Sequence, residues 1–320
     1  MKEPKVSIII PVYNAEITIE KCLKSLINQK FIKNYEIIVI EDLSKDKTYK
    51  IVKAMSKIYK NIFLYKNNKN LGGTESRNVG IKLSRGSIIA FTDSDCLAKR
   101  DWLYEITKPI IKRKELAVQG YSGGEKKRVW QTITQEAYDY YMKSIISNKY
   151  ANRLDTRNCA VHKDVFNKIG LFNGDLRRSG DAEFGLRMIE KGFKIFYNRT
   201  ANIYHLHRTN LAEVLKISYT QGFNYPILMR LRKKVVSKND KLRLFRVIMG
   251  FLLLVLLFLF NVKTTIFLIS ISILYYLIKL FYKPYKLLLP RFVYHFLNSI
   301  SFFFGFFISV LKLNIKRLQK

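Results

Sequence analysis

Two patterns of apolar and polar residues alternate along the first 200 residues. Continuous apolar runs such as VSIIIPV (6–12) and EIIVIED (36–42) are typical of strands that are buried on both faces. Between them lie apolar residues at helical spacing, for example Ile19, Leu23 and Leu26. The same patterns predict further strands at NIFLYK (61–66), SIIAFTD (87–93) and LAVQGY (116–121), and further helices at 46–58, 75–84 and 101–113.

This order of elements predicts an α/β fold. Strands that are separated by single helices are joined by right-handed crossovers, so they run parallel in one sheet. We therefore expect a mainly parallel sheet flanked by helices over residues 1–210, with Thr74 as the N-cap of the helix at 75–84.

The pattern changes after residue 246. Three stretches carry no Asp, Glu, Lys or Arg: 247–260, 264–278 and 292–311. Only the last reaches the roughly 20 residues of a membrane-spanning helix, and tilting or flanking lysines could extend the others. Buried core helices are the alternative. The predicted organisation is a domain at 1–210, a basic amphipathic interfacial linker at 211–246, two to three membrane helices within 247–311 and a basic tail at 312–320.

The composition narrows the class of protein. The 320 residues hold 57 Lys+Arg against 24 Asp+Glu, a net charge of +33, and 48% are hydrophobic, which excludes a disordered polar chain. Three widely spaced cysteines exclude a disulfide scaffold. The basic surplus fits an anionic membrane surface, nucleic acid or a lysine-rich proteome. Basic residues beside the apolar stretches favour the membrane, and no nucleic-acid recognition module is present.

Polar side chains follow the predicted strands, where open parallel sheets bind ligands. Asn14 follows the first strand, Asp42 ends the second, and Asp93-Ser94-Asp95 follows the fourth. Two carboxylates this close repel each other unless a cation or hydrogen-bond donors compensate, and hard oxygen ligands suit Mg²⁺ or Mn²⁺. There is no GxxxxGK[ST] and no GxGxxG after the first strand, so a P-loop nucleotidase and a dinucleotide oxidoreductase are disfavoured.

Several motifs in this order carry a resemblance. VSIIIPVYN (6–14), IEDLSKD (40–46), NLGGTESRNVGIKLSRGSIIAFTDSD (70–95) and SGDAEFGLRMIEKGFKI (179–195) resemble the motif series of family 2 glycosyltransferases with the GT-A fold. TRNCAVHKDVFNKIGLF (156–172) is similar to the acceptor-side segment of that family. The resemblance covers residues 1–210. It implies transfer of a sugar from a nucleoside-diphosphate donor, usually with a metal and with inversion at the anomeric carbon.

The resemblance implies a donor side. Pro11, Tyr13 and Asn14 match the first nucleotide loop, and Asp42 matches the carboxylate that holds the base or the ribose. Arg77 matches a position that bridges the nucleotide and the metal loop.

The resemblance also implies a metal side. Asp93 would contact the ribose or the sugar, and Asp95 would bind Mn²⁺ or Mg²⁺ beside the diphosphate. His205 in IYHLHR (203–208) is a candidate to complete the metal site, with His207 as its competitor. Cys96 stands where the family often has Asp, and we expect it to be inert.

On the acceptor side, Asp181 matches the catalytic base, which takes the proton of the acceptor hydroxyl. Glu183 competes with it for that role, and Asn158 lies in the acceptor-side segment. Gly180 departs from the family, which usually has an acid there.

The predicted function is a metal-dependent, inverting glycosyltransferase on the cytosolic face of the cell membrane. Its acceptor would be lipid-linked or a growing glycan, and its donor would carry UDP or, second, GDP. Two alternatives stay open, namely a processive polysaccharide synthase and a non-catalytic membrane scaffold. The first usually has a QxxRW-like motif, but Trp102 and Trp130 are the only tryptophans here.

Overall fold

The computed structural model describes residues 5–31, 34–124, 127–176, 179–206, 211–231, 270, 294 and 297–310. The chain divides into two compact units. The first comprises Met1–Lys126 and Thr134–His207, and the second comprises Lys127–Ile133 and Arg208–Lys320.

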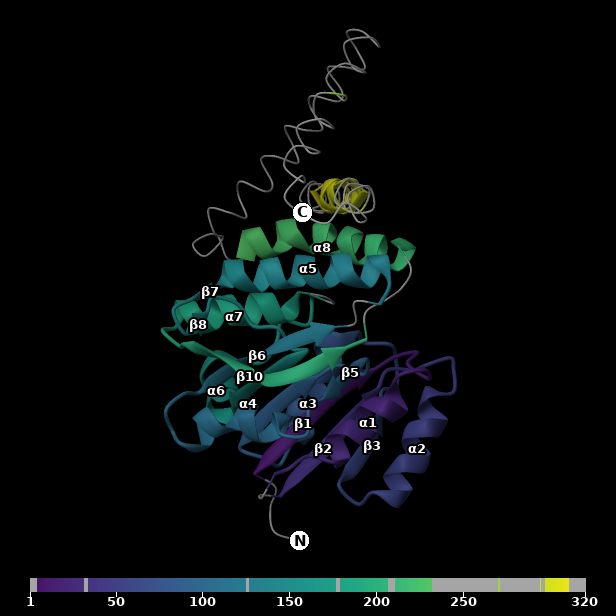
Figure 1. The fold of residues 1–320 in the computed structure, drawn as a ribbon, viewed down its shortest axis with the longest axis vertical. Helices are drawn as coiled ribbons and strands as arrows, with labels where there is room; N and C mark the ends of the chain where they lie inside the picture. The colour runs from purple at the N-terminus through teal and green to yellow at the C-terminus, as the bar shows by residue number, and fades with distance from the viewer. Residues whose placement is uncertain are drawn as a thin grey trace, which may run out of the picture. The chain divides into compact units, whose positions relative to one another are not determined.

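Half of the sheet in the first unit is parallel, as the apolar runs predict. Its order is β3-β2-β1-β4, and every pairing within it is parallel. Helices connect these strands (Figure 1). The elements are β1 (Val6–Val12), α1 (Ile19–Ile27), β2 (Tyr35–Glu41), α2 (Thr48–Ile58), β3 (Ile62–Lys66), α3 (Gly73–Leu83) and β4 (Ile88–Thr92).

The other half of the sheet corrects the prediction of a mainly parallel sheet. Strand β9 pairs antiparallel with both β4 and β6, while β6 and β10 run parallel, so the sheet is mixed. The regular alternation of one strand with one helix ends at β6. Helix α5 and the hairpin of β7 and β8 separate β6 from β9, and two helices separate β9 from β10. The elements are β5 (Cys96–Ala98), α4 (Trp102–Ile111), β6 (Ala117–Gly124), α5 (Val129–Ile145), β7 (Ile146–Ser147), β8 (Tyr150–Ala151), β9 (Asn158–His162), α6 (Lys163–Ile169), α7 (Gly180–Glu190) and β10 (Ile195–His205).

The alternation of side chains along the strands builds a core on each face of the sheet. On β1, Ile8 and Ile10 belong to the cluster that α1 and α4 cover, while Ile9 belongs to the opposite one. Helix α3 packs closely on that second face, since a Cβ on Gly80 would lie 2.5 Å from Ile9 Cγ2. Both faces of the strands are therefore buried, as their continuous apolar runs predict.

Helix α8 (Leu211–Leu231) in the second unit contacts the helical segment 297–310. Ser301 Oγ donates to the Leu215 carbonyl over 2.7 Å, and the Tyr225 and Phe302 rings meet edge to face. A Cβ on Gly222 would collide with the Phe302 carbonyl, so the small residue lets the two backbones approach.

The predicted membrane stretches at 247–260 and 264–278 lie outside the described residues apart from position 270. The third stretch, at 292–311, is helical over 297–310. Among the helices that the structure describes, none combines the length and the apolar character that a bilayer crossing requires.

Candidate active site

Asn14 connects the loop after β1 to the loop after β2 through two hydrogen bonds. Its backbone N–H donates to Ser44 Oγ over 3.0 Å, and its side-chain Oδ1 accepts from the Lys45 N–H over 2.8 Å. Asn14 has a φ of 49°, a left-handed conformation that asparagine tolerates better than most residues. The Tyr13 side chain beside it is 47% exposed, and Pro11 lies on β1 itself. The resemblance leads us to expect these residues at the nucleotide, and the structure brings them to the carboxyl end of the strand.

Asp42 supports the start of helix α3. Its carboxylate accepts hydrogen bonds of 2.8 Å from the Asn67 side chain and from the Leu71 and Gly72 N–H groups, and it is 3% exposed. Gly72 is the N-cap, with a φ of 81° that favours glycine. The prediction of Thr74 as the N-cap is therefore wrong. Asp42 is buried and its carboxylate is already hydrogen-bonded, which argues against direct contact with a nucleoside. Its predicted role at the nucleoside is not tested by these contacts and stays a prediction.

Arg77 connects helix α3 to the loop after β4. Its Nη2 lies 2.5 Å from Asp93 Oδ1, and its side chain is 13% exposed. A partly buried ion pair of this kind is shielded from water, so each partner orients the other. The pair joins two residues that were predicted at the donor and at the metal loop.

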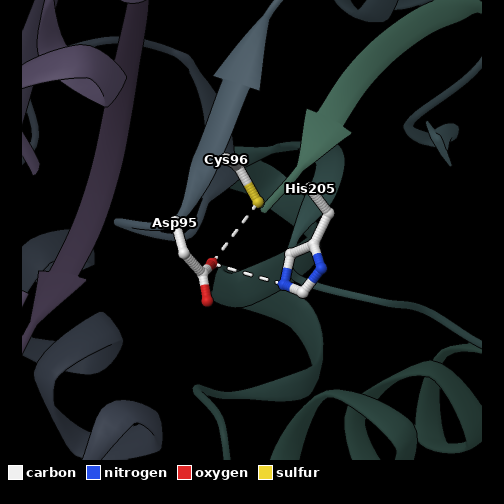
Figure 2. A group of neighbouring side chains, drawn as sticks. All are labelled: Asp95, Cys96 and His205. Atoms are coloured by element: carbon white, nitrogen blue, oxygen red, sulfur yellow. Dashed lines mark hydrogen bonds and ion pairs between the residues drawn. The ribbon is translucent and has the colours of Figure 1, made fainter. Parts of the chain in front are cut away.

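Asp95, Cys96 and His205 bring three potential ligand atoms together, as Figure 2 shows. Asp95 Oδ1 lies 3.4 Å from His205 Nε2 and 3.7 Å from Cys96 Sγ, and all three ligand atoms lie within 4.8 Å of one another. The structure therefore brings the predicted Asp95 and His205 together and adds Cys96, which we expected to be inert. His207, the competing candidate, lies outside the described residues.

These three residues fit a divalent cation. Carboxylate oxygen and imidazole nitrogen are ligands for several divalent ions, and a thiolate adds a softer one. Strand pairing sets the cluster, because β5 and β10 are antiparallel with Cys96 directly opposite His205. Cys96 and His205 therefore lie on paired strands, and Asp95 lies in the turn directly before β5.

Asp181 lies in the first turn of helix α7, after Ser179 in a left-handed conformation. One of its oxygens accepts from the Ala182 N–H over 2.8 Å, and the other accepts weakly from Thr156 over 3.4 Å. Burial, followed by the charge of Asp155, raises the pKa of Asp181, and these effects outweigh the opposing effect of Arg77. A carboxylate with a raised pKa is a stronger base than an ordinary one.

Glu183, the competing candidate for the base, has a structural environment. It is 1% exposed, and its carboxylate pairs with Arg187 at 3.0 Å. Arg187 Nη2 also donates to the Leu171 carbonyl over 2.7 Å. The pair therefore fastens α7 to the preceding loop, which argues against Glu183 as a base or as an acceptor contact.

Asn158, predicted on the acceptor side, is instead a buried residue that connects strands β6 and β10 with helix α4 through hydrogen bonds. Its Nδ2 donates to the Tyr121 and Ala201 carbonyls over 2.8 and 2.9 Å, and its Oδ1 accepts from Trp102 Nε1 over 2.8 Å. It is fully buried. Its side-chain groups are engaged with strands β6 and β10 and helix α4, so a direct acceptor contact is disfavoured.

Sequence reasoning missed the ion pair of Asp155 and Arg157. The guanidinium binds the carboxylate at 2.6 Å and stacks over the Tyr138 ring with its Cζ 4.7 Å from the centroid. Although burial opposes it, Arg157 lowers the pKa of Asp155 overall. The charge of Asp155 raises the pKa of Asp181, and the charge of His205 lowers the pKa of Asp155, so the Asp155–Arg157 pair is linked electrostatically to both predicted site residues. The only signal in the sequence was their position, because Arg157 lies within the TRN (156–158) of the acceptor-side segment and Asp155 directly precedes it.

Comparison with known proteins identifies the family. Residues 7–170, about half of the chain, match the family model described as glycosyl transferase family 2. The glycosyltransferase AglE of Haloferax volcanii is 30% identical over 226 residues, which cover 68% of this chain and 72% of that protein. A dolichyl N-acetyl-α-D-glucosaminyl phosphate 3-β-D-2,3-diacetamido-2,3-dideoxy-β-D-glucuronosyltransferase of Methanococcus voltae is 28% identical over 239 residues, with 70% and 74% covered.

The fold agrees with this family. The mannosyltransferase PcManGT from Pyrobaculum calidifontis, solved with GDP-Man and Mn²⁺, superimposes with a TM-score of 0.70 at 17% identity. The superposition covers 94% of this chain and 87% of that chain. The likeness shows a shared GT-A-type fold, and the matches in sequence show descent. The chain therefore belongs to glycosyl transferase family 2 and is a glycosyltransferase.

Proposed function

We propose that this glycosyltransferase is metal-dependent and inverting, and that it transfers a sugar from a nucleoside diphosphate to a lipid-linked acceptor. The observation that carries the proposal is the grouping of charges around Asp155. The charge of Asp155 raises the pKa of Asp181, the proposed base, and the charge of His205, which lies 3.4 Å from Asp95 Oδ1, lowers the pKa of Asp155. This grouping supports a single site that contains the proposed base and the proposed metal ligands.

Asp181 would act on the acceptor hydroxyl. The hydroxyl oxygen forms a bond to the anomeric carbon while its proton passes to the Asp181 carboxylate. The bond from the anomeric carbon to the diphosphate oxygen breaks, and its electron pair leaves with the diphosphate. A single displacement of this kind inverts the anomeric carbon, and general-base help is typically worth about 10²–10⁴ in rate.

Asp95 and His205 would hold Mn²⁺ or Mg²⁺. When bound, the cation supplies positive charge to the departing diphosphate. Arg77 supports the same side of the site, because its pairing with Asp93 orients the loop that carries Asp95. Pro11, Tyr13 and Asn14 would line the nucleotide, with the exposed Tyr13 ring available for stacking on the base.

The donor base is proposed as uracil first and guanine second. Solved proteins of similar fold include one with UDP-GlcNAc, the TarS fragment 1–349 of S. aureus, and one with GDP-Man. These likenesses support the fold alone, so a donor panel must contain both bases.

The acceptor and the location rest on two further observations. The apolar stretches with flanking basic residues fit an anionic membrane surface on the cytosolic side. The relative from Methanococcus voltae has a dolichyl-linked phosphate sugar in its name. Both support a lipid-linked acceptor at the membrane.

The test is transfer of label into lipid. Membranes that contain the protein are incubated with radiolabelled UDP- and GDP-sugars plus Mn²⁺, and label is counted in the organic extract. Asp181→Asn is the inactive variant. Glu190→Gln is the matched control, because it removes an exposed carboxylate from the same helix.

We expect label from one donor, lost with Asp181→Asn and with a chelator but kept with Glu190→Gln. Full activity of Asp181→Asn would overturn the base assignment. Transfer that survives exhaustive chelation would overturn the metal dependence, and nucleotide release without lipid label would overturn the lipid acceptor.

A further inference from the structure

We infer that Cys96 supplies a thiolate ligand to the cation site, which gives the site a preference for Zn²⁺ and Co²⁺ over Mg²⁺. The inference rests on the proposed metal site at Asp95 and His205. It adds a sulfur ligand where we expected an inert residue.

The spacing of the three side chains fits one cation. For a tetrahedral ion with ligands at about 2.0–2.3 Å, neighbouring ligand atoms lie about 3.3–3.6 Å apart. Asp95 Oδ1 lies 3.4 Å from His205 Nε2 and 3.7 Å from Cys96 Sγ. Two edges of the ligand triangle therefore already have nearly the required length, and the third is within 4.8 Å.

The sheet holds these ligands in place. Cys96 on β5 is the direct antiparallel partner of His205 on β10, so their side chains project from the same face. The Asp95 carbonyl accepts from the Leu206 N–H over 2.9 Å, and the Cys96 N–H donates to the Asp93 carbonyl over 3.1 Å. Figure 2 shows the sulfur directed toward the Asp95 carboxylate beside the imidazole. Little rearrangement is needed for all three to bind one ion.

The ligand set determines the preference. Mg²⁺ and Ca²⁺ favour sites made wholly of oxygen, whereas a thiolate with an imidazole and one carboxylate suits Zn²⁺ and Co²⁺. On binding, the Cys96 thiol gives its proton to solvent as the sulfur–metal bond forms. Three protein ligands leave a fourth position, which a water or a diphosphate oxygen of the donor can take.

The other two cysteines are matched controls. Cys22 and Cys159 are buried free thiols like Cys96. Cys22 Sγ lies 3.5 Å from the Asp93 carbonyl, and Cys159 lies on β9, which pairs with β4 and β6. Among the described residues, only Asp95, Cys96 and His205 form a group with metal-ligand spacing.

The first experiment is a Co²⁺ titration of the purified full chain, followed by absorption spectroscopy. We expect visible bands of a tetrahedral site together with a near-ultraviolet sulfur-to-cobalt charge-transfer band. Cys96→Ser should lose the charge-transfer band, whereas Cys22→Ser and Cys159→Ser should keep it. Loss of a group that only hydrogen-bonds to a metal ligand typically costs about 10–100-fold in metal affinity. Cys96→Ser removes a direct ligand, so it should weaken Zn²⁺ binding by about 100-fold or more.

The second experiment uses the wild-type chain, so it does not depend on the folding of a variant. X-ray absorption of the Zn²⁺-loaded protein should show one sulfur at about 2.3 Å. A shell of nitrogen and oxygen alone, a cobalt spectrum without the charge-transfer band, or no cobalt binding would overturn the inference. Transfer of sugar with Mn²⁺ alongside such a result would leave the proposed function intact. If the absorption data show the sulfur ligand but no sugar is transferred from any donor, the metal site stands and the proposed function is overturned.

Discussion

Arg77 Nη2 lies 2.5 Å from Asp93 Oδ1, and this contact ties helix α3 to the loop that carries Asp95. The two side chains are 13% and 28% exposed, so water screens the pair only in part. A contact between residues from separate motifs thus positions the proposed metal loop.

Replacing Arg77 by Met should reduce both stability and transfer. The substitution leaves the Asp93 carboxylate without this partner, at a cost of about 1–3 kcal/mol. Urea denaturation measures the cost, and the double variant Arg77→Met/Asp93→Asn should recover part of it. Additive losses in the double-mutant cycle would contradict a direct coupling.

Asp181→Asn should lower transfer by about 10²–10⁴, the usual contribution of a general base. Wild-type activity should fall as the pH drops through the pKa of Asp181, which burial and Asp155 raise above its ordinary value. The pH–rate profile checks this. An acid limb at the ordinary pKa of an aspartate would speak against the assignment.

The same substitution should stabilise the protein at neutral pH. A carboxyl whose pKa is raised in the folded state contributes stability below its unfolded pKa, and this contribution is lost as the pH rises through the folded pKa. An asparagine does not ionise, so it avoids that loss. Thermal denaturation at pH 7 should therefore give a higher midpoint for Asp181→Asn than for the wild type, with the difference vanishing at acid pH.

Glu183→Gln separates the two candidate bases. It weakens the buried pair with Arg187, so we expect a loss of about 1–3 kcal/mol in stability. Transfer per folded molecule should stay near the wild-type value at a temperature where the variant is folded. A loss of transfer as large as that of Asp181→Asn would return Glu183 to the catalytic role.

Gly180→Ala should destabilise the protein because the site is too small for a side chain. A Cβ there would lie 2.5 Å from Thr74 Cγ2, and overpacking of this kind costs about 1–3 kcal/mol. Thr74→Ala removes the colliding atom, so the double variant should regain stability in a denaturation experiment.

The sequence predicted much of the fold and only part of the site. The strands β1 to β4 and their helices follow from apolar runs and helical periodicity, because these patterns reflect local geometry. The antiparallel direction of β9 could not be predicted, because the local pattern of apolar residues does not determine whether a strand pairs parallel or antiparallel. The membrane organisation stays a prediction, since most of 247–311 lies outside the described residues.

The sequence by itself determined the family and the order of motifs along the chain, because these depend on residue identity and spacing. Only the tertiary structure decided what each polar side chain contacts. Asp42 meets Gly72 across 30 positions, and Asn158 meets Trp102 across 56, so both became supports of the fold. Cys96 and His205 lie opposite each other because β5 pairs with β10. Such partners come from distant parts of the chain, and only the packed sheet brings them within hydrogen-bonding or metal-binding distance.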